Sequence, residues 1–183
     1  MREQELKKLH ALLLPRGFRI FEIPADGHCM FRAVANQLEG IRALLLAGSA
    51  GDDGAPGAGP PPEILSSSRS FMELRALVAG HMRRGADQYL PFVEEDLGEG
   101  DRREAFDAYC TEIETTAKWG GQLELRALAD AMLYPIEVYS ADMPVVTLGE
   151  HAAPDARLPP IRLCYQKHAY GLGEHYNAIQ TRA

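Results

Sequence analysis

The chain has 183 residues, of which 46% are hydrophobic and 25% are charged, and its formal net charge is −7 at pH 7. These proportions are typical of one globular domain with a sizeable core. The acidic balance argues against a general nucleic-acid binder, which usually presents a basic stripe. Because no apolar run approaches the roughly 18 residues of a membrane span, we expect neither a nucleic-acid nor a membrane partner.

Cysteine usage indicates a reducing compartment. Only Cys29, Cys110 and Cys164 occur, and no CxxC pair is present, so the sequence predicts neither a disulfide framework nor a four-ligand zinc site. The N-terminal segment MREQELKKLH is charged and lacks the apolar core of a signal peptide. We therefore expect a soluble intracellular protein, located in the cytoplasm or alternatively in the nucleus.

The first quarter of the chain predicts two helices with a short strand between them. Residues 2–14 carry leucines at helical spacing, and a Pro-Arg-Gly segment ends this pattern. A short extended run follows at residues 18–23. A second apolar pattern at helical spacing then begins at or near Cys29 and reaches about Leu46.

Residues 47–63 form a segment of unusual composition, AGSAGDDGAPGAGPPPE. The segment has almost no side chains that can pack into a core, and it contains several residues that break regular structure. We predict a disordered surface insertion at this point.

Three further amphipathic helices are predicted in the middle of the chain. Ser70 and Glu73 stand at capping-box spacing before the first of them. A second helix follows Asp101 and continues to about Thr116, and a third follows Trp119-Gly120-Gly121 and continues to about Met132.

From Pro135 onward the pattern changes to short strands. The runs PIEVYS, PVVTL, IRLCYQ and HYNAIQ are rich in strand-forming residues and are separated by Pro, Asp and Gly. Helices first and strands last, with one short early strand, predict an α+β fold in which helices flank a sheet. We expect a single domain over residues 1–183.

The position of Cys29 points to a nucleophile. The residue follows Asp26-Gly27 at the start of a predicted helix, where unpaired backbone amides and the helix dipole favour thiolate over thiol. Such sites can lower a cysteine pKa from about 8.5 to roughly 3.5–7.5. A buried, inert cysteine is the alternative, because free cysteine is among the most buried residue types. The local pattern alone is compatible with both.

A thiolate nucleophile needs a general base, which can lie far away in the sequence. His175 begins HYNAIQ directly after the turn-like GLGE, at a loop-to-strand junction where a side chain is exposed yet backed by a sheet. Asn177 lies two residues on and therefore on the same strand face. Its amide can accept a hydrogen bond from one imidazole nitrogen and leave the other aimed at the sulfur. We therefore predict that Cys29, His175 and Asn177 form a set of the kind seen in thiol proteases.

Three sequence blocks, DGHCMFRAVANQL, KWGGQLELRALADAM and GEHYNAI, together closely resemble the ovarian-tumour (OTU) family of deubiquitinating cysteine proteases, in particular the OTU-domain-containing protein 6 group. The resemblance covers residues 18–179 and implies the papain-like fold of that family, an α+β fold with a small, mostly antiparallel sheet flanked by helices. By this likeness Cys29 corresponds to the family nucleophile and His175 to its histidine. Asp26 falls on the acidic position of the cysteine loop, and Asn177 falls on the polar position that often completes the triad.

The resemblance also implies a reaction. It is hydrolysis of isopeptide or peptide bonds after the C-terminal Gly-Gly of ubiquitin, through an acyl-enzyme on Cys29. Backbone amides of Cys29 and of the Asp26-Gly27-His28 loop would hold the oxyanion, a placement that helix N-termini favour. No metal or organic cofactor is needed. We expect a monomer whose partner is ubiquitin or a polyubiquitin chain.

Several alternatives stay open at this point. The chain could be a catalytically silent ubiquitin-binding module, a protease for a ubiquitin-like modifier, or a redox sensor at Cys29. The group that orients His175 is also open. Strand periodicity favours Asn177, whereas Asp26, three residues before Cys29, is better placed to brace the cysteine loop. Residues 47–63 depart from the family pattern.

Overall fold

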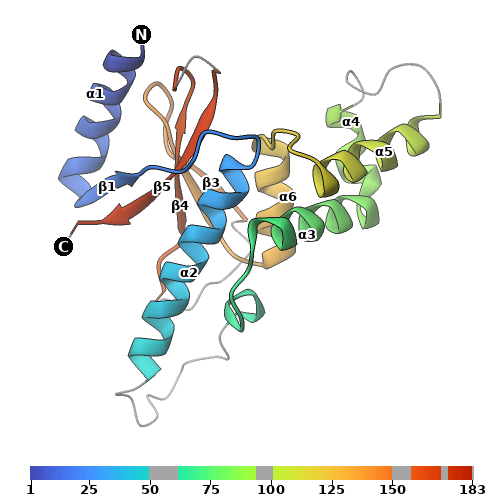
Figure 1. The fold of residues 1–183 in the computed structure, drawn as a ribbon, viewed down its shortest axis with the longest axis horizontal. Coiled ribbons are helices and arrows are strands. Elements are labelled where there is room, and N and C mark those ends of the chain that lie inside the picture. Colours follow the sequence, from blue (N-terminus) through green and yellow to red (C-terminus); the bar gives the residue numbers. More distant parts are fainter. Residues whose placement is uncertain (50–61, 94–100, 150–157, 170–172, 183) are drawn as a thin grey trace.

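The computed structural model describes residues 1–49, 62–93, 101–149, 158–169 and 173–182, and these form helices around one sheet (Figure 1). The helices are α1 (Arg2–Leu13), α2 (Cys29–Ser49), α3 (Phe71–Arg84), α4 (Ala86–Val93), α5 (Arg102–Thr115) and α6 (Gln122–Met132). The strands are β1 (Phe18–Phe21), β2 (Ile136–Tyr139), β3 (Val146–Leu148), β4 (Ile161–Gln166) and β5 (His175–Thr181). Short 3-10 helices occupy Leu14–Arg16 and Glu63–Leu65.

The strands form one sheet in the order β1-β5-β4-β2-β3. Neighbouring strands are antiparallel except for β2 and β4, which run parallel. The predicted fold class, an α+β fold with a small, mostly antiparallel sheet flanked by helices, is confirmed. Strand β5 is an inner strand, and the hydrogen bonds of its two neighbours fix the position of any side chain that it carries.

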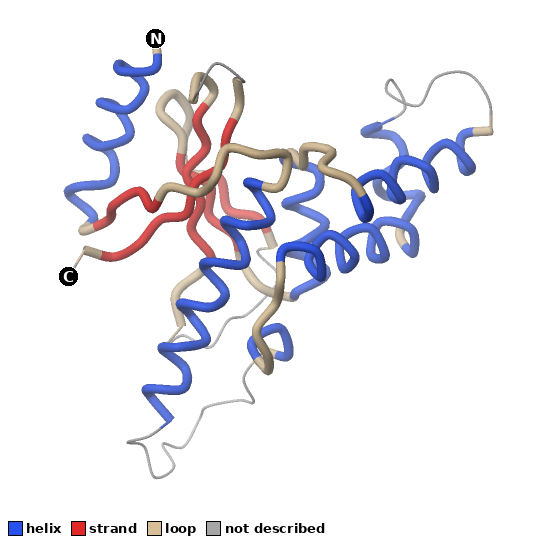
Figure 2. The backbone as a smooth tube through the Cα atoms, viewed as in Figure 1, coloured by secondary structure: helices blue, strands red, loops and turns tan. Residues whose placement is uncertain are grey.

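Helices cover both faces of the sheet because side chains alternate along each strand. On one face, Leu163 and Ala178 belong to the main core, to which α2, α3, α5 and α6 contribute. On the other face, Cys164 and Ile179 pack with Leu9 of α1 in a second, smaller cluster. Figure 2 shows the strands gathered between α1 and the group of helices formed by α3, α4, α5 and α6.

The predicted helix starts in the middle of the chain are confirmed. The hydroxyl of Ser70 accepts a hydrogen bond from the Glu73 amide, and the Glu73 carboxylate accepts one from the Ser70 amide, so α3 begins with a full capping box. The Asp101 carboxylate accepts from the Arg103 and Glu104 amides at the start of α5. Both caps satisfy amides that have no partner within the first turn of a helix.

Two features differ from the sequence prediction. Helix α2 extends to Ser49, so residues 47–49 of the predicted insertion are helical, and Glu63 begins a 3-10 helix. Residues 50–61 lie outside the described residues. Helix α4 was not predicted, because it is short and carries Pro91, but its buried Tyr89 and Val93 pack into the main core. In the described part of the chain, no helix combines the length and apolar character that a membrane crossing requires.

Candidate active site

The cysteine loop, residues 24–28, lies between β1 and α2, and Cys29 is the first residue of that helix. The predicted helix start is thereby confirmed. The Asp26 N–H donates to the carbonyl of Pro24 at 3.0 Å, and the Cys29 N–H donates to the carbonyl of Asp26 at 3.2 Å. These two short-range hydrogen bonds tighten the chain directly before the thiol.

The pKa of the Cys29 thiol differs from the sequence expectation. Partial burial raises this pKa above its ordinary value, and the negative charge of Asp26 raises it further, although the backbone amides of Tyr176 and Met30 lower it. The prediction that the helix start lowers the pKa is therefore wrong, because desolvation outweighs the amides. A thiol of raised pKa is protonated at pH 7, so a base must remove its proton before it can attack.

Asp26 braces the cysteine loop from within. Its Oδ1 accepts the His28 N–H at 2.8 Å, and its Oδ2 pairs with Nε of Arg32, in the first turn of α2, at 3.0 Å. Both contacts hold the loop, and neither involves His175. The Gly27 N–H makes no hydrogen bond to any described residue, so among the amides predicted for an oxyanion it is the one still able to donate.

A buried arginine holds the same loop from outside. Arg75 of α3 is 0% exposed, and its guanidinium donates to the Gly27 carbonyl at 2.7 Å and to Nδ1 of His28 at 2.9 Å. The same group donates to the carbonyls of Ile113 at 2.6 Å and Lys118 at 2.8 Å. It therefore ties the cysteine loop to the end of α5 and to the segment that follows α5.

Arg75 was not predicted from the sequence as a site residue, although a signal was present. Arg75 stands three residues before Val78 and seven before Met82, at helical spacing, so it lies on the face of α3 that enters the core. A charged side chain on such a face requires hydrogen-bond partners. Its effect on His28 is visible in the pKa of that ring, which burial lowers and the positive charge of Arg75 lowers further. His28 is therefore held neutral, with Nδ1 accepting from Arg75.

His175 and Asn177 are the first and third residues of β5, and both are buried. Nε2 of His175 lies 3.1 Å from Oδ1 of Asn177. Because an amide oxygen can only accept, this hydrogen bond places the proton on Nε2 and leaves Nδ1 as the basic nitrogen of the neutral ring. The two residues meet as the strand period predicted, and the geometry supports Asn177 as the group that orients the ring.

Two further groups fix the amide of Asn177. Its Oδ1 also accepts the Ile23 N–H at 2.7 Å, which identifies this atom as the oxygen because a backbone N–H can only donate. Its Nδ2 donates to Oε1 of Gln166 on β4 at 2.9 Å. The tautomer of His175 therefore follows from the position of a backbone amide in the chain directly after β1.

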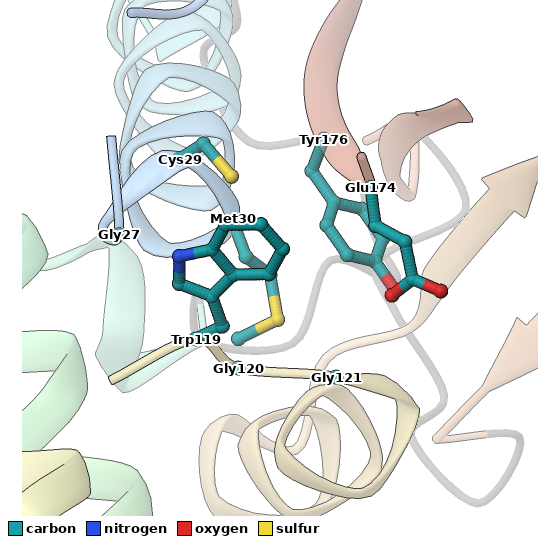
Figure 3. A pocket seen from close by; sticks show the side chains of 8 residues that line it. All are labelled: Gly27, Cys29, Met30, Trp119, Gly120, Gly121, Glu174 and Tyr176. Atoms are coloured by element: carbon teal, nitrogen blue, oxygen red, sulfur yellow. The ribbon is translucent and has the colours of Figure 1, made fainter. Parts of the chain in front are cut away.

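A cavity of about 180 Å³ lies beside the thiol (Figure 3). Its walls come from the start of α2, the segment before α6 and the start of β5. The lining residues are Gly27, Cys29, Met30, Trp119, Gly120, Gly121, Glu174 and Tyr176. The backbone amide of Tyr176 donates a hydrogen bond to the Cys29 sulfur and lowers the pKa of the thiol. The thiol and the residue next to His175 therefore meet at this cavity.

Two glycines bring the cavity walls together. A Cβ on Gly27 would lie 1.9 Å from the carbonyl oxygen of Ala117, so only glycine fits where the cysteine loop crosses the segment before α6. The Gly121 amide donates to the buried carboxylate of Glu124 at 2.7 Å, which fixes the other end of that segment. Three glycines therefore contribute backbone to the cavity walls, and the side chains of Met30, Trp119, Glu174 and Tyr176 form the rest of the lining.

The predicted site residues fall into two groups in the structure. Asp26, Gly27, His28 and Cys29 form one group at the start of α2, and His175 with Asn177 forms the other at the start of β5. Their catalytic roles stay predictions. In the described part of the chain, no cluster of three or more His, Cys, Asp or Glu side chains could hold a metal ion.

Comparison with known protein families and curated proteins gives a consistent match. Residues 24–176 match the family model of the OTU-like cysteine proteases. The chain is 36% identical over 179 residues to "Deubiquitinase OTUD6B" of Homo sapiens, covering 97% of this chain and 52% of that protein. It is 35% identical over 180 residues to "OTU domain-containing protein 6A" of Mus musculus, covering 98% and 51%. The chain thus spans about half the length of the curated relatives it matches.

Solved structures match the fold. The OTUD1 OTU domain superposes with a TM-score of 0.60 at 22% identity, over 98% of this chain and 96% of that one. An OTU domain solved in complex with ubiquitin superposes with a TM-score of 0.52 at 14% identity, over 89% of this chain and 69% of that one.

Proposed function

The chain belongs to the OTU-like cysteine protease family, and from this premise we propose that it hydrolyses isopeptide or peptide bonds after the C-terminal Gly-Gly of ubiquitin. The family resemblance predicted from the three sequence blocks is confirmed. The substrate is proposed because relatives with 35–37% identity over nearly the whole chain include several named deubiquitinases. The acidic net charge of −7 suits a partner with a basic face.

One observation supports the chemistry most directly. Oδ1 of Asn177 accepts from both the Ile23 N–H and Nε2 of His175, which leaves Nδ1 of the ring as the base. The Cys29 thiol, whose pKa is raised, requires such a base. The pairing of a protonated thiol with a ring of fixed tautomer is the arrangement that general-base activation needs.

The proposed reaction begins when Nδ1 of His175 takes the proton of Cys29. The thiolate sulfur attacks the carbonyl carbon of the terminal glycine, and the negative charge moves to the carbonyl oxygen. We assign that oxygen to the amide of Gly27, because the His28 and Cys29 amides already donate to Asp26. The imidazolium then gives its proton to the departing amine, and the C–N bond breaks to leave a thioester on Cys29.

The second half of the proposed reaction restores the enzyme. Nδ1 of His175 removes a proton from water, the hydroxide attacks the thioester carbonyl, and the Cys29 sulfur leaves and takes the proton back. Gly27, Gly120 and Gly121 line the cavity beside the thiol, and this glycine-rich lining supports a substrate tail that ends in two glycines.

A panel of ubiquitin and ubiquitin-like proteins that carry a C-terminal electrophile tests this function. We expect the ubiquitin probe to attach to Cys29, as located by peptide mass spectrometry, and no adduct on Cys29→Ala. Cys110 and Cys164 serve as internal controls, because burial raises their pKa values to about 11 and about 12. Reaction with a ubiquitin-like probe alone would identify a protease for that modifier, and binding without an adduct would identify a silent ubiquitin-binding module.

A further inference from the structure

Gln166 is a buried polar residue next to the proposed base. It is the last residue of β4 and pairs in register with His175 in the antiparallel ladder, so the two side chains share one face of the sheet. Asn177 is two residues after His175 and lies on that face as well. The exposed fractions of Gln166, His175 and Asn177 are 4%, 3% and 2%, so the three polar side chains form a set removed from water.

If the side chain at position 166 only filled space, an apolar residue would be more stable there than glutamine. Burying an amide costs free energy unless its polar atoms are hydrogen-bonded. Oε1 of Gln166 meets this requirement by accepting the Nδ2–H of Asn177 at 2.9 Å. The hydrogen bond is therefore the contribution of Gln166 that a methionine of similar length cannot make.

The hydrogen bond acts on the amide that orients the base. At one end of the Asn177 amide, the oxygen accepts from the Ile23 N–H and from His175. At the other end, Gln166 accepts from the nitrogen. With both ends held, the amide plane cannot rotate, and its oxygen stays directed at Nε2 of His175.

We propose that Gln166 is a positioning residue that acts through Asn177, holding His175 in the tautomer whose Nδ1 accepts the Cys29 proton. Its catalytic consequence rests on the proposed function, whereas its effect on the Cys29–His175 pair is independent of the substrate. The Asn177 oxygen stabilises the ring most when the ring is protonated. Loss of the Gln166 contact therefore disfavours the thiolate–imidazolium pair.

The test compares Gln166→Met with Gln166→Glu in the 183-residue chain. The rate of Cys29 alkylation by iodoacetamide is measured against pH, and kcat and KM are measured with a ubiquitin substrate. In Gln166→Met, the rising limb of the plot of alkylation rate against pH should move to higher pH. The value of kcat should fall roughly tenfold with KM unchanged, which is the size of effect expected for one neutral hydrogen bond. Gln166→Glu keeps the acceptor and adds a negative charge that favours imidazolium, so the limb should move to lower pH.

Leu163→Val is the matched control, because Leu163 lies on the same strand but faces the main core. This variant should lower Tm and leave the limb in place. The proposal is overturned if Gln166→Met keeps the wild-type limb and kcat, or if it moves the limb no further than Leu163→Val does. If the wild type fails to hydrolyse the ubiquitin substrate, the proposed function fails, and the iodoacetamide profiles still decide the role of Gln166.

Discussion

The two halves of the candidate site are held in place by different chemistry. The cysteine loop has no secondary structure and is held by charged groups: the Asp26 carboxylate, which pairs with Arg32, and the buried Arg75 guanidinium. The half on β5 belongs to a regular strand, and the contacts of Asn177 with Ile23 and Gln166 are made between neutral amides.

The difference follows from where the backbone finds its partners. A strand inside a sheet satisfies its amides and carbonyls in the ladder, so only side-chain orientation remains to be fixed. An irregular loop has no ladder. Its Gly27 carbonyl is satisfied by Arg75, and a charged donor makes a stronger hydrogen bond than a neutral one. Charged side chains therefore hold the cysteine loop in place, and neutral amides orient the ring of His175.

Arg75→Met should produce the largest effect on stability and activity, because it removes the buried charged group that holds the cysteine loop. The buried carbonyl of Ile113 and the part-buried carbonyls of Gly27 and Lys118 lose their donor, and a buried group left unsatisfied costs about 1–3 kcal/mol. We expect the free energy of unfolding to fall by at least ~3 kcal/mol, as measured by urea denaturation. Reaction of Cys29 with a ubiquitin probe should be lost.

The control for Arg75→Met is Arg83→Met on the same helix. Arg83 makes a partly exposed pair with Glu114, and such pairs contribute about 0–1 kcal/mol. Should Arg75→Met fold too poorly to measure, Arg75→Lys keeps the charge and part of the hydrogen bonding, and it should react slowly but detectably with the probe. Equal losses of stability in Arg75→Met and Arg83→Met would contradict the role assigned to Arg75.

Asn177→Ala removes the hydrogen bonds between neutral groups at the start of β5, and it should mainly lower turnover. The ring of His175 loses its fixed tautomer, so kcat should fall about 100-fold, within the range for general acid–base catalysis, with little change in KM. The kinetic constants are measured with a ubiquitin substrate. Asn177→Asp keeps an oxygen that accepts from Ile23 and His175, and it should retain most of the activity. Wild-type kcat in Asn177→Ala would remove Asn177 from the site.

Asp26→Asn tests whether the Asp26 carboxylate braces the cysteine loop or orients His175. We expect turnover to fall about tenfold or less. An asparagine oxygen can still accept the His28 N–H, so the loop keeps its turn. The negative charge of Asp26 raises the pKa of the Cys29 thiol, and its removal should shift the labelling limb of Cys29 to lower pH. If Asp26 were instead the partner of His175, its loss would shift that limb to higher pH.

The smallest expected effect is on stability at alkaline pH. Burial raises the pKa of Cys110 to about 11 and that of Cys164 to about 12, from an ordinary value of 9.0. A raised folded-state pKa stabilises the protein fully below pH 9, and that stabilisation is lost as the pH rises through the folded-state values, by about 1.4 kcal/mol per pH unit for each thiol. Thermal unfolding between pH 8 and pH 11 should therefore show a shallower decline of Tm in Cys164→Ala than in the wild type. Equal slopes would show that Cys164 does not contribute.

Much of the local structure could be predicted because local signals decide it. The start of α2 at Cys29 follows from an apolar helical pattern after a turn dipeptide, and the capping box at Ser70 is visible in the sequence itself. The contact between His175 and Asn177 follows from the two-residue period of a strand. Helix α4 was missed because its stability comes from packing of Tyr89 and Val93 and not from local propensity.

The amino-acid sequence by itself determined the order of the elements, the α+β class and the residues of the candidate triad, since each depends on spacing along the chain. Only the tertiary structure decided the strand order, the parallel pairing of β2 with β4 and the burial that raises the pKa of Cys29. It also brought Arg75 to Gly27 and Gln166 to Asn177, over separations of 48 and 11 residues. The physical reason is that burial and hydrogen bonding depend on which groups share a volume, and residues distant in sequence share a volume only after the chain has folded.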